Sequence, residues 1–504
     1  MTGKKDKSSN EFLAVIYSII LSALLLSVLS FTTSPLYHEP LSGDSAIFWT
    51  IGRFWMEGHL PYVELWDLKG PFIFLCNGIG YLITHSISGL FILQILFNAI
   101  SFYLTFKTLR TEYNTKWAMW LTAIIALGYG ALLFGGNRVE EYVLPFITLA
   151  VFYIYKWTKE HEKGKTDHNP LHASVYGMVL GLSLMTRLTN AIGICGAVAV
   201  IIVTLIIKRR WANLGKNALY FIAGTAITTL PFIIYFYLND ALYEMWYGTV
   251  LYNLEYTDSS IFHINSFYGL RKILTRTANC YGLIIIGIMM LMVKDENAKK
   301  KVGTTATIWI IMGVLTLLWF LKSFGYGYYM IISIPYAAVV FNELKTICSK
   351  DCLMTRKKLF NTILVAYTLL AVTSFAYAVY AMKRMYLFNY YLPIFRQSAA
   401  LLPDDYKDSF IAYNLNADIY QYEDICPAYP YFALQQYEIG RGQSLGPRVM
   451  EQFSSCNAKY IITANGKLLI DNILQQNYIL IEKNEWYSLY VRKDILPKIK
   501  GMSE

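Results

Sequence analysis

Residues 12–31 read FLAVIYSIILSALLLSVLSF, a run of apolar and small polar residues without a charged side chain. A helix of roughly 20 apolar residues is long enough to cross the hydrocarbon core of a bilayer. The run lies shortly after the polar segment MTGKKDKSSN and continues without an A-x-A-like cleavage site. We therefore expect a retained transmembrane helix here and not a cleaved signal peptide.

The composition of the rest of the chain extends this prediction. The 504 residues are 55% hydrophobic and only 15% charged, whereas a soluble domain carries roughly 25% charged residues. The charged residues gather in short clusters between long apolar runs, as expected of a polytopic membrane protein. We assign the net charge of +10 to basic loops and not to a nucleic-acid partner. The motifs G-x-x-x-x-G-K-[ST], H-E-x-x-H and G-x-S-x-G are absent from the sequence, and nothing indicates a nucleotide site.

The apolar runs predict about eleven transmembrane helices. A further apolar run, residues 71–85, is short and follows a proline. The predicted spans are 12–31, 89–106, 117–134, 142–155, 173–186, 189–207, 217–238, 278–293, 303–321, 328–344 and 359–380.

The distribution of Lys and Arg predicts the orientation. If residues 71–85 do not cross, the loops on the N-terminal side of the membrane carry 23 basic residues and the loops on the other side carry 8. Cytoplasmic loops are the basic ones in most membrane proteins. The bias would be lost if residues 71–85 crossed, so we expect them to form a helix at the outer interface. The N-terminus is then cytoplasmic, and the region after residue 380 lies outside.

Two regions outside the spans have their own character. The first outer loop contains SAIFWTIGRFWMEG, in which apolar residues recur at helical spacing, so we expect two interfacial helices in this loop. Residues 381–504 alternate short strand and helix patterns and end in a hairpin pattern, which predicts a small extracytoplasmic α/β domain. We therefore divide the chain into a transmembrane domain, 1–380, and this domain, 381–504. The sequence leaves open whether Cys426 and Cys456 form a disulfide.

Three acidic residues are candidate catalytic groups. Asp44 ends the turn Leu41-Ser42-Gly43-Asp44 at the start of a helical pattern, where it is either an N-cap or a base that accepts a proton from a substrate hydroxyl. Glu140 and Glu141 open a predicted span after a Gly-Gly turn. Acids at a helix N-terminus are favoured by the helix dipole, so a structural role and a catalytic role are both open for this pair.

Five of the sparse cations on the predicted outer side are candidate substrate-binding groups. They are Arg53, Lys69, Arg138, Arg187 and Lys322. An Arg at the interface either extends to the headgroups or binds a phosphate through its planar guanidinium group. We expect the second role above all for Arg187, which lies in a tight turn between two spans.

Tyr328 and Tyr329 follow a glycine-rich outer turn. They belong either to an aromatic belt at the interface or to the lining of a sugar or lipid-phosphate pocket.

The order of these features over residues 10–345 resembles that of GT-C class membrane glycosyltransferases, the superfamily of protein O-mannosyltransferases and lipid A aminoarabinose transferases. A first helix leads to a long outer loop with an acid, and a W-D-x-K-G-P stretch precedes an interfacial helix. The matching positions are Gly43-Asp44, Tyr62–Pro71 (YVELWDLKGP), Arg138-Val139-Glu140-Glu141, Thr186-Arg187, and Tyr328-Tyr329 with Pro335.

The resemblance implies a sugar donor on a polyprenyl phosphate and a glycan, lipid or protein acceptor. It matches Asp44 to the catalytic acid of the first loop and Glu140 or Glu141 to the second acidic site. Asp67 and Lys69 of the W-D-x-K-G-P stretch become substrate-binding candidates. Relatives often have His-Tyr where this chain has Tyr328-Tyr329, which puts a histidine contact to phosphate or acceptor in doubt. Whether a divalent metal takes part is open.

The sequence therefore predicts a glycosyltransferase in a bacterial plasma membrane that acts on the outer face. A transporter or flippase for lipid-linked glycans is the main alternative, but the chain lacks the internal repeats typical of transporters. A glycan polymerase or ligase and an inactive membrane scaffold are further alternatives.

Overall fold

The computed structural model is mostly helical, with a small sheet near the C-terminus. It describes residues 2–37, 43–258, 303–323, 326–350, 354–387, 391–400, 402–439, 444–455 and 458–498. The predicted span at 278–293 and Cys456 lie outside these ranges.

The chain divides into two compact units. Both are discontinuous in sequence, because the first loop and residues 233–262 belong with the C-terminal region. Unit 1 comprises Met1–Leu36, Phe91–Phe232 and His263–Met382, and unit 2 comprises Tyr37–Leu90, Ile233–Phe262 and Lys383–Glu504.

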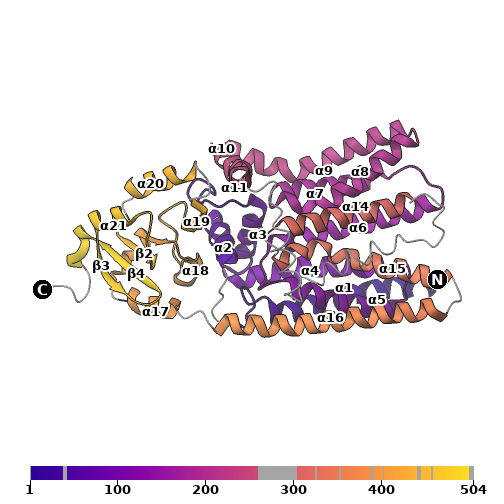
Figure 1. Ribbon diagram of the computed structural model, residues 1–504, viewed down its shortest axis with the longest axis horizontal. Coiled ribbons are helices and arrows are strands. Elements are labelled where there is room, and N and C mark those ends of the chain that lie inside the picture. The colour runs from indigo at the N-terminus through magenta and orange to yellow at the C-terminus, as the bar shows by residue number, and fades with distance from the viewer. Residues whose placement is uncertain are drawn as a thin grey trace. The chain divides into compact units, whose positions relative to one another are not determined.

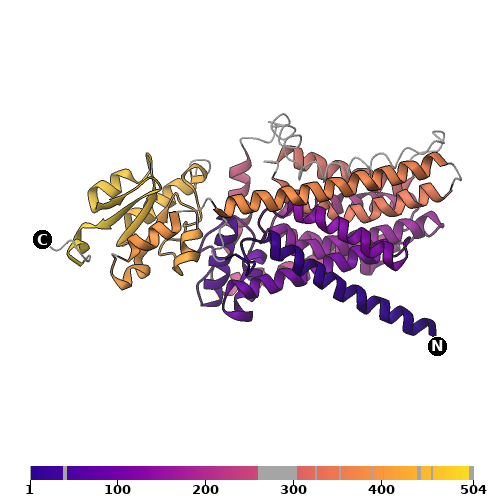
Figure 2. The ribbon, with the colours of Figure 1, turned by 90° about the horizontal axis from the view of Figure 1, so that it is seen from below.

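Long helices make up unit 1 and run in broadly the same direction in both views (Figure 1 and Figure 2). Every predicted span within the described residues falls on a helix. The helices are α1 (Thr2–Leu29), α4 (Ile87–Leu109), α5 (Thr115–Leu132), α6 (Val139–Glu162), α7 (Pro170–Leu184), α8 (Ile192–Ile207), α9 (Trp211–Leu238), α14 (Thr304–Lys322), α15 (Ile334–Lys350) and α16 (Met354–Leu387), with the 3-10 turns η1 (Leu188–Ala191) and η3 (Gly327–Ser333).

Five segments among the described residues are helical, long and apolar enough to cross a membrane. They are Glu11–Leu29, Ile87–Leu109, Leu188–Ile207, Trp211–Leu238 and Phe360–Arg384. The structure thus agrees with a polytopic membrane protein, and the number of crossings and their orientation stay predictions.

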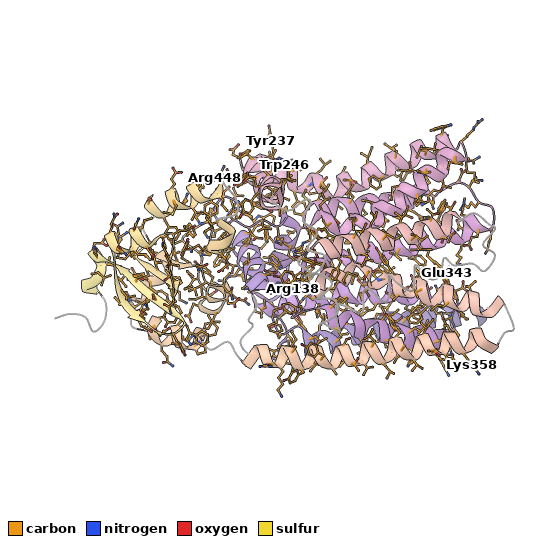
Figure 3. All side chains as sticks on the ribbon, in the orientation of Figure 1. Arg138, Tyr237, Trp246, Glu343, Lys358 and Arg448 are labelled. Carbon is orange, nitrogen blue, oxygen red and sulfur yellow. The ribbon has the colours of Figure 1, made fainter. Side chains whose placement is uncertain are left out.

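Helix α6 lies at the centre of unit 1. It packs against α7, α8, α14 and α15, and its side chains from Val139 to Ala150 are almost all buried. At its C-terminal end, Lys159 forms an ion pair of 2.5 Å with Glu343 of α15. Figure 3 shows Glu343 and Arg138 at opposite ends of the helices of unit 1. One helix therefore joins the two ends of this unit.

Helices α2 (Gly43–Met56) and α3 (Pro71–Thr84) of unit 2 confirm the two helices predicted in the first loop. Their backbones touch at a pair of glycines. A Cβ atom on Gly52 would lie 2.5 Å from the carbonyl oxygen of Phe74, and one on Gly78 would lie 2.8 Å from that of Gly52. Only residues without a side chain fit this crossing. The position of both helices relative to a membrane stays a prediction.

The W-D-x-K-G-P loop packs within unit 2. Trp66 is buried, and its backbone N–H donates to the carbonyl oxygen of Pro430 at 2.9 Å. Its ring lies edge-on to Tyr252 and against Tyr431. Tyr252 belongs to a helical segment made of α10 (Leu242–Trp246), the π-helical turn η2 (Tyr247–Leu251) and α11 (Tyr252–Asp258). The conspicuous tryptophan of the motif is therefore a packing residue.

The C-terminal part of unit 2 is a mixed sheet between helices, as predicted for an α/β domain. The strand order is β1-β2-β4-β3, with β1 parallel to β2 and the other pairs antiparallel. The elements are α17 (Tyr391–Ala399), η4 (Asp404–Ser409), β1 (Phe410–Tyr413), α18 (Asp418–Glu423), α19 (Gln436–Ile439), α20 (Leu445–Ser455), β2 (Tyr460–Ala464), α21 (Asp471–Asn477), β3 (Tyr478–Lys483), β4 (Tyr487–Arg492) and η5 (Lys493–Lys498).

Helices cover both faces of this sheet. Phe395 of α17 contacts Phe410 on one face, whereas Phe453 of α20 contacts Tyr413. Phe410 and Tyr413 are three positions apart on one strand, so their side chains point to opposite faces. The predicted hairpin is confirmed as β3–β4, and Asn484 closes its turn by accepting from the backbone N–H groups of Trp486 and Tyr487. The domain boundary at residue 380 stays a prediction.

We predict that Gly52→Ala destabilises the protein. The added methyl group would force the α2 and α3 backbones apart, and overpacking of this kind typically costs about 1–3 kcal/mol. Gly215→Ala in α9 is the matched control, because a Cβ atom there meets no atom within 4 Å. Thermal unfolding of the purified protein in detergent is the measurement. Equal melting temperatures for the two variants would contradict the close crossing of α2 and α3.

Candidate active site

The turn before α6 has an uncommon backbone. Phe134, Gly135, Gly136 and Asn137 all have positive φ angles, of 48°, 93°, 85° and 53°. A bulky residue such as Phe rarely adopts this region. A Cβ atom on Gly135 would lie 2.1 Å from the Phe31 ring. The two glycines therefore let the chain pass close to α1 and enter α6 in a fixed direction.

Glu141 anchors the first turn of α6. Its Oε1 atom accepts a hydrogen bond of 2.6 Å from the backbone N–H of Arg138. Its Oε2 atom accepts from Gln94 at 3.1 Å, from Tyr129 at 3.2 Å and from Asn98 at 3.5 Å. Both oxygens of this fully buried carboxylate are therefore engaged by the protein itself, which makes Glu141 a structural cap.

Glu140, the next residue toward the N-terminus, has a different environment. Its side chain is 1% exposed and forms a 2.5 Å ion pair with Arg187, whose side chain is 16% exposed. Its Oε2 atom is buried without a hydrogen-bond partner among the described residues. Arg187 lies between α7 and η1. The pair therefore joins the start of α6 to the end of α7 and holds one guanidinium group in a defined place.

Tyrosines of η3 complete this cluster. The Arg187 guanidinium lies 4.3 Å from the ring centre of Tyr329, and that of Arg138 lies 4.8 Å from the ring centre of Tyr328. The two tyrosine rings meet edge-on at 4.8 Å, and Tyr326 stacks on Tyr328 at 5.5 Å. The tyrosines that follow the glycine-rich turn thus hold both arginines by cation–π contacts.

This arrangement suits an anionic group. Two guanidinium groups and the N-terminus of a 24-residue helix lie together in a largely buried place. Guanidinium groups match the oxygen geometry of phosphate, and a helix N-terminus favours negative charge. The carboxylate of Glu140 pairs with Arg187, and that of Glu141 is engaged by the backbone N–H of Arg138 and by neutral side chains. Among the predicted site residues, the structure brings together Arg138, Glu140, Glu141, Arg187, Tyr328 and Tyr329.

The first-loop candidates lie in unit 2. Asp67 is buried, and its Oδ2 atom accepts from the backbone N–H of Lys69 at 3.1 Å. Burial raises the pKa of Asp67, and the negative charge of Asp44 raises this pKa further. Asp44 lies in the first turn of α2, as predicted, and is close enough to Asp67 for their charges to interact. The loop therefore holds two carboxyl groups near each other.

Two other candidate cations do not belong to either group. Arg53 lies at the end of α2, where it pairs with Glu57 at 3.0 Å and with Asp424. Lys322 is the last residue of α14, and its side chain lies outside the described part of the chain. Among the residues that the structure describes, no group of three or more His, Cys, Asp and Glu side chains is placed to bind a metal ion.

The residues that hold Glu141 were not among the predicted site residues; they are Gln94, Asn98 and Tyr129. Gln94 and Asn98 carry a recognisable signal, because they are polar side chains inside the predicted span 89–106. Such residues usually face the interior of a helix bundle.

The fold is shared with solved membrane glycosyltransferases. ArnT from Cupriavidus metallidurans bound to undecaprenyl phosphate aligns with a TM-score of 0.59 at 12% identity, over 95% of this chain and 97% of that chain. Its apo state aligns over the same shares with a TM-score of 0.54 at 13% identity. The oligosaccharyltransferase from Archaeoglobus fulgidus, in complex with Zn and sulfate, gives a TM-score of 0.52 at 15% identity over 89% of this chain and 68% of that chain. At these identities the likeness shows the fold: this chain has a GT-C-like fold, as its sequence predicted.

The family is shown by the sequence itself. Residues 3–396 match the family model described as "Putative competence-induced protein Ccs4 N-terminal domain". The matched region is most of the chain, and the protein belongs to this family. No curated protein matches the chain by sequence.

We predict that Glu141→Ala destabilises unit 1. The substitution removes the acceptor for the buried donors of Gln94, Asn98 and Tyr129, and a buried donor left without a partner typically costs about 1–3 kcal/mol. Glu160→Ala is the control on the same helix, because Glu160 is partly exposed and pairs with the exposed Lys165. Melting temperatures of the purified variants are the measurement. A Glu141→Ala protein as stable as Glu160→Ala would show that Glu141 has no capping role.

Proposed function

We propose that the protein is a membrane glycosyltransferase that moves a sugar from a polyprenyl-phosphate donor to a glycan, lipid or protein acceptor. The observation that carries this proposal is the cluster at the start of α6. There, Arg187 is held by Glu140 and Tyr329, and Arg138 is held by Tyr328. In the proposed reaction this cluster binds the phosphate of the donor.

The comparisons support the proposal at two levels. The solved structures compared above, ArnT and the archaeal oligosaccharyltransferase, are those of glycosyltransferases. One of them, ArnT, is bound to undecaprenyl phosphate, which is a polyprenyl phosphate and contains the kind of anionic group that the α6 cluster suits. A lipid-linked donor is also consistent with the absence of nucleotide-binding motifs from the sequence.

The proposed reaction is a single displacement. The oxygen of an acceptor hydroxyl attacks the anomeric carbon of the donor sugar and forms the new glycosidic bond. The bond from that carbon to the phosphate oxygen breaks, and the lipid phosphate leaves with the bonding electrons. Asp44 accepts the proton of the hydroxyl. Arg187 and Arg138 stabilise the charge that grows on the leaving phosphate, a preorganised electrostatic effect that often dominates enzymatic catalysis. Glu140 keeps Arg187 in place.

The proposal includes a location for the reaction. Eleven crossings with the N-terminus in the cytoplasm would place the first loop and residues 381–504 outside, in line with the uneven distribution of basic residues. We propose a bacterial plasma membrane and transfer on its outer face. The transmembrane domain would then be residues 1–380, with the α/β domain at 381–504.

We predict that Asp44→Asn abolishes transfer and leaves the protein folded. Loss of a general base typically lowers the rate by about 10²–10⁴, whereas Asn caps a helix as well as Asp does. Asp471→Asn in the first turn of α21 is the matched control. Turnover of synthetic undecaprenyl-phosphate hexoses and pentoses by purified protein is the measurement, with melting temperature as the test of folding. Normal turnover in Asp44→Asn would remove Asp44 from the mechanism.

We predict that Arg187→Lys weakens use of the donor. Lys keeps a positive charge beside Glu140 but lacks the planar fork that binds two phosphate oxygens at once. We expect the KM for the lipid-phosphate sugar to rise about tenfold and the melting temperature to change little. Arg210→Lys is the control, because Arg210 is an exposed residue that pairs with Asp167. Unchanged donor dependence in Arg187→Lys and in Arg187→Gln would place the phosphate contact elsewhere, with Lys322 as the next candidate.

A further inference from the structure

Unit 2 contains a cavity of about 460 Å³ that the proposed reaction does not use. It lies at the C-terminal ends of α2, α3 and α18. Small-molecule sites in proteins commonly have volumes of about 300–1,000 Å³. Aromatic and charged side chains line the cavity: Trp49, Tyr81, Tyr422, Arg53, Arg396 and Asp424.

The charges in the wall of this cavity are already paired. Arg53 contacts both Glu57 and Asp424. Arg396 donates from its Nε atom to Glu423 at 3.0 Å and from its second guanidinium nitrogen to the carbonyl oxygen of Tyr422 at 3.1 Å. Each guanidinium group therefore has a carboxylate beside it. This balance of charge in the cavity wall disfavours a phosphate as the ligand.

Aromatic rings lie beside these polar groups in the wall. Tyr422 lies under Arg396, with 4.0 Å from the guanidinium carbon to the ring centre. Trp49 and Tyr81 meet edge-on at 6.0 Å, and Tyr81 donates its hydroxyl to Glu57 at 2.7 Å. The wall thus combines aromatic rings with several hydrogen-bond donors and acceptors. A ligand that matches it has apolar C–H faces, many hydroxyl groups and no net charge.

We propose that this cavity binds a neutral oligosaccharide. Sugar rings have apolar faces that pack on aromatic side chains, and their hydroxyl groups hydrogen-bond to arginine and carboxylate groups without requiring an opposite charge. That the bound sugar is the acceptor of transfer rests on the proposed function. The binding of the sugar does not.

Binding of neutral tetrasaccharides to the full-length protein in detergent is the test. Maltotetraose, cellotetraose and chitotetraose are titrated, and the binding is followed by intrinsic tryptophan fluorescence and by saturation-transfer NMR. We expect saturable binding of at least one of them, with an affinity that is the same at low and at high salt.

Tyr422→Ala and Tyr81→Ala should each weaken this binding about tenfold. Tyr81→Phe keeps the ring and should bind as the wild type does. Trp486→Ala removes an exposed aromatic residue of the same unit and should also leave binding unchanged.

Three results would overturn the proposal. The first is that none of the tetrasaccharides shows saturable binding. The second is that Tyr422→Ala and Tyr81→Ala proteins with normal melting temperatures bind with wild-type affinity. The third is that inorganic phosphate displaces the bound sugar. Binding is measured without turnover, so failure of the proposed transferase activity leaves this test intact. If both proposals hold, Tyr422→Ala raises the KM for the acceptor and leaves the KM for the donor unchanged.

Discussion

Glu140 is almost completely buried and accepts a hydrogen bond from Arg187, a residue 47 positions further along the chain. Two charges in such a place are stable only together, because removing one member of a buried pair typically costs about 3–5 kcal/mol. The pair joins α6 to the segment after α7. It also orients Arg187 toward Tyr329. The ion pair and the Tyr329 ring therefore both help to position the guanidinium group at the α6 cluster.

The pair in turn depends on the way α6 begins. Four successive residues with positive φ bring the chain past Phe31 and into the helix. Glu141 then stabilises the first helical turn, and its own carboxylate accepts hydrogen bonds from Gln94, Asn98 and Tyr129. Two neighbouring acids thus have different tasks. Glu141 stabilises the helix start, and Glu140 is left to position a cation. A cap built from buried side chains is rigid, and rigidity is what electrostatic stabilisation of a transition state requires.

Two kinds of charged environment occur in this molecule. In unit 1, Arg187 pairs with Glu140 at the α6 cluster, and Arg187 and Arg138 both lie over tyrosine rings. In unit 2, the arginines of the cavity are each paired with carboxylates. The first environment combines guanidinium groups with a helix N-terminus, and the second supplies hydrogen bonds from groups that are already ion-paired. This difference supports the proposals of a phosphate at the α6 cluster and of a neutral, hydroxyl-rich ligand in the cavity.

Local sequence was sufficient for the elements. Apolar runs of about 20 residues predicted the long helices, helical spacing predicted α2, and the pattern around Lys483-Asn484 predicted the β3–β4 hairpin. The order of motifs also predicted the GT-C-like fold, because such elements and their spacing are properties of contiguous residues. The roles of Glu140 and Glu141 were not separable in the same way. Neighbouring residues on a helix point in different directions, so Glu140 and Glu141 contact different parts of the protein. Glu141 accepts from Gln94, which lies 47 residues before it. Glu140 accepts from Arg187, which lies 47 residues after it. Sequence alone determined that acids and arginines stand at the ends of apolar helices. Only the tertiary structure decided which of them meet, because those contacts join helices that are far apart along the chain.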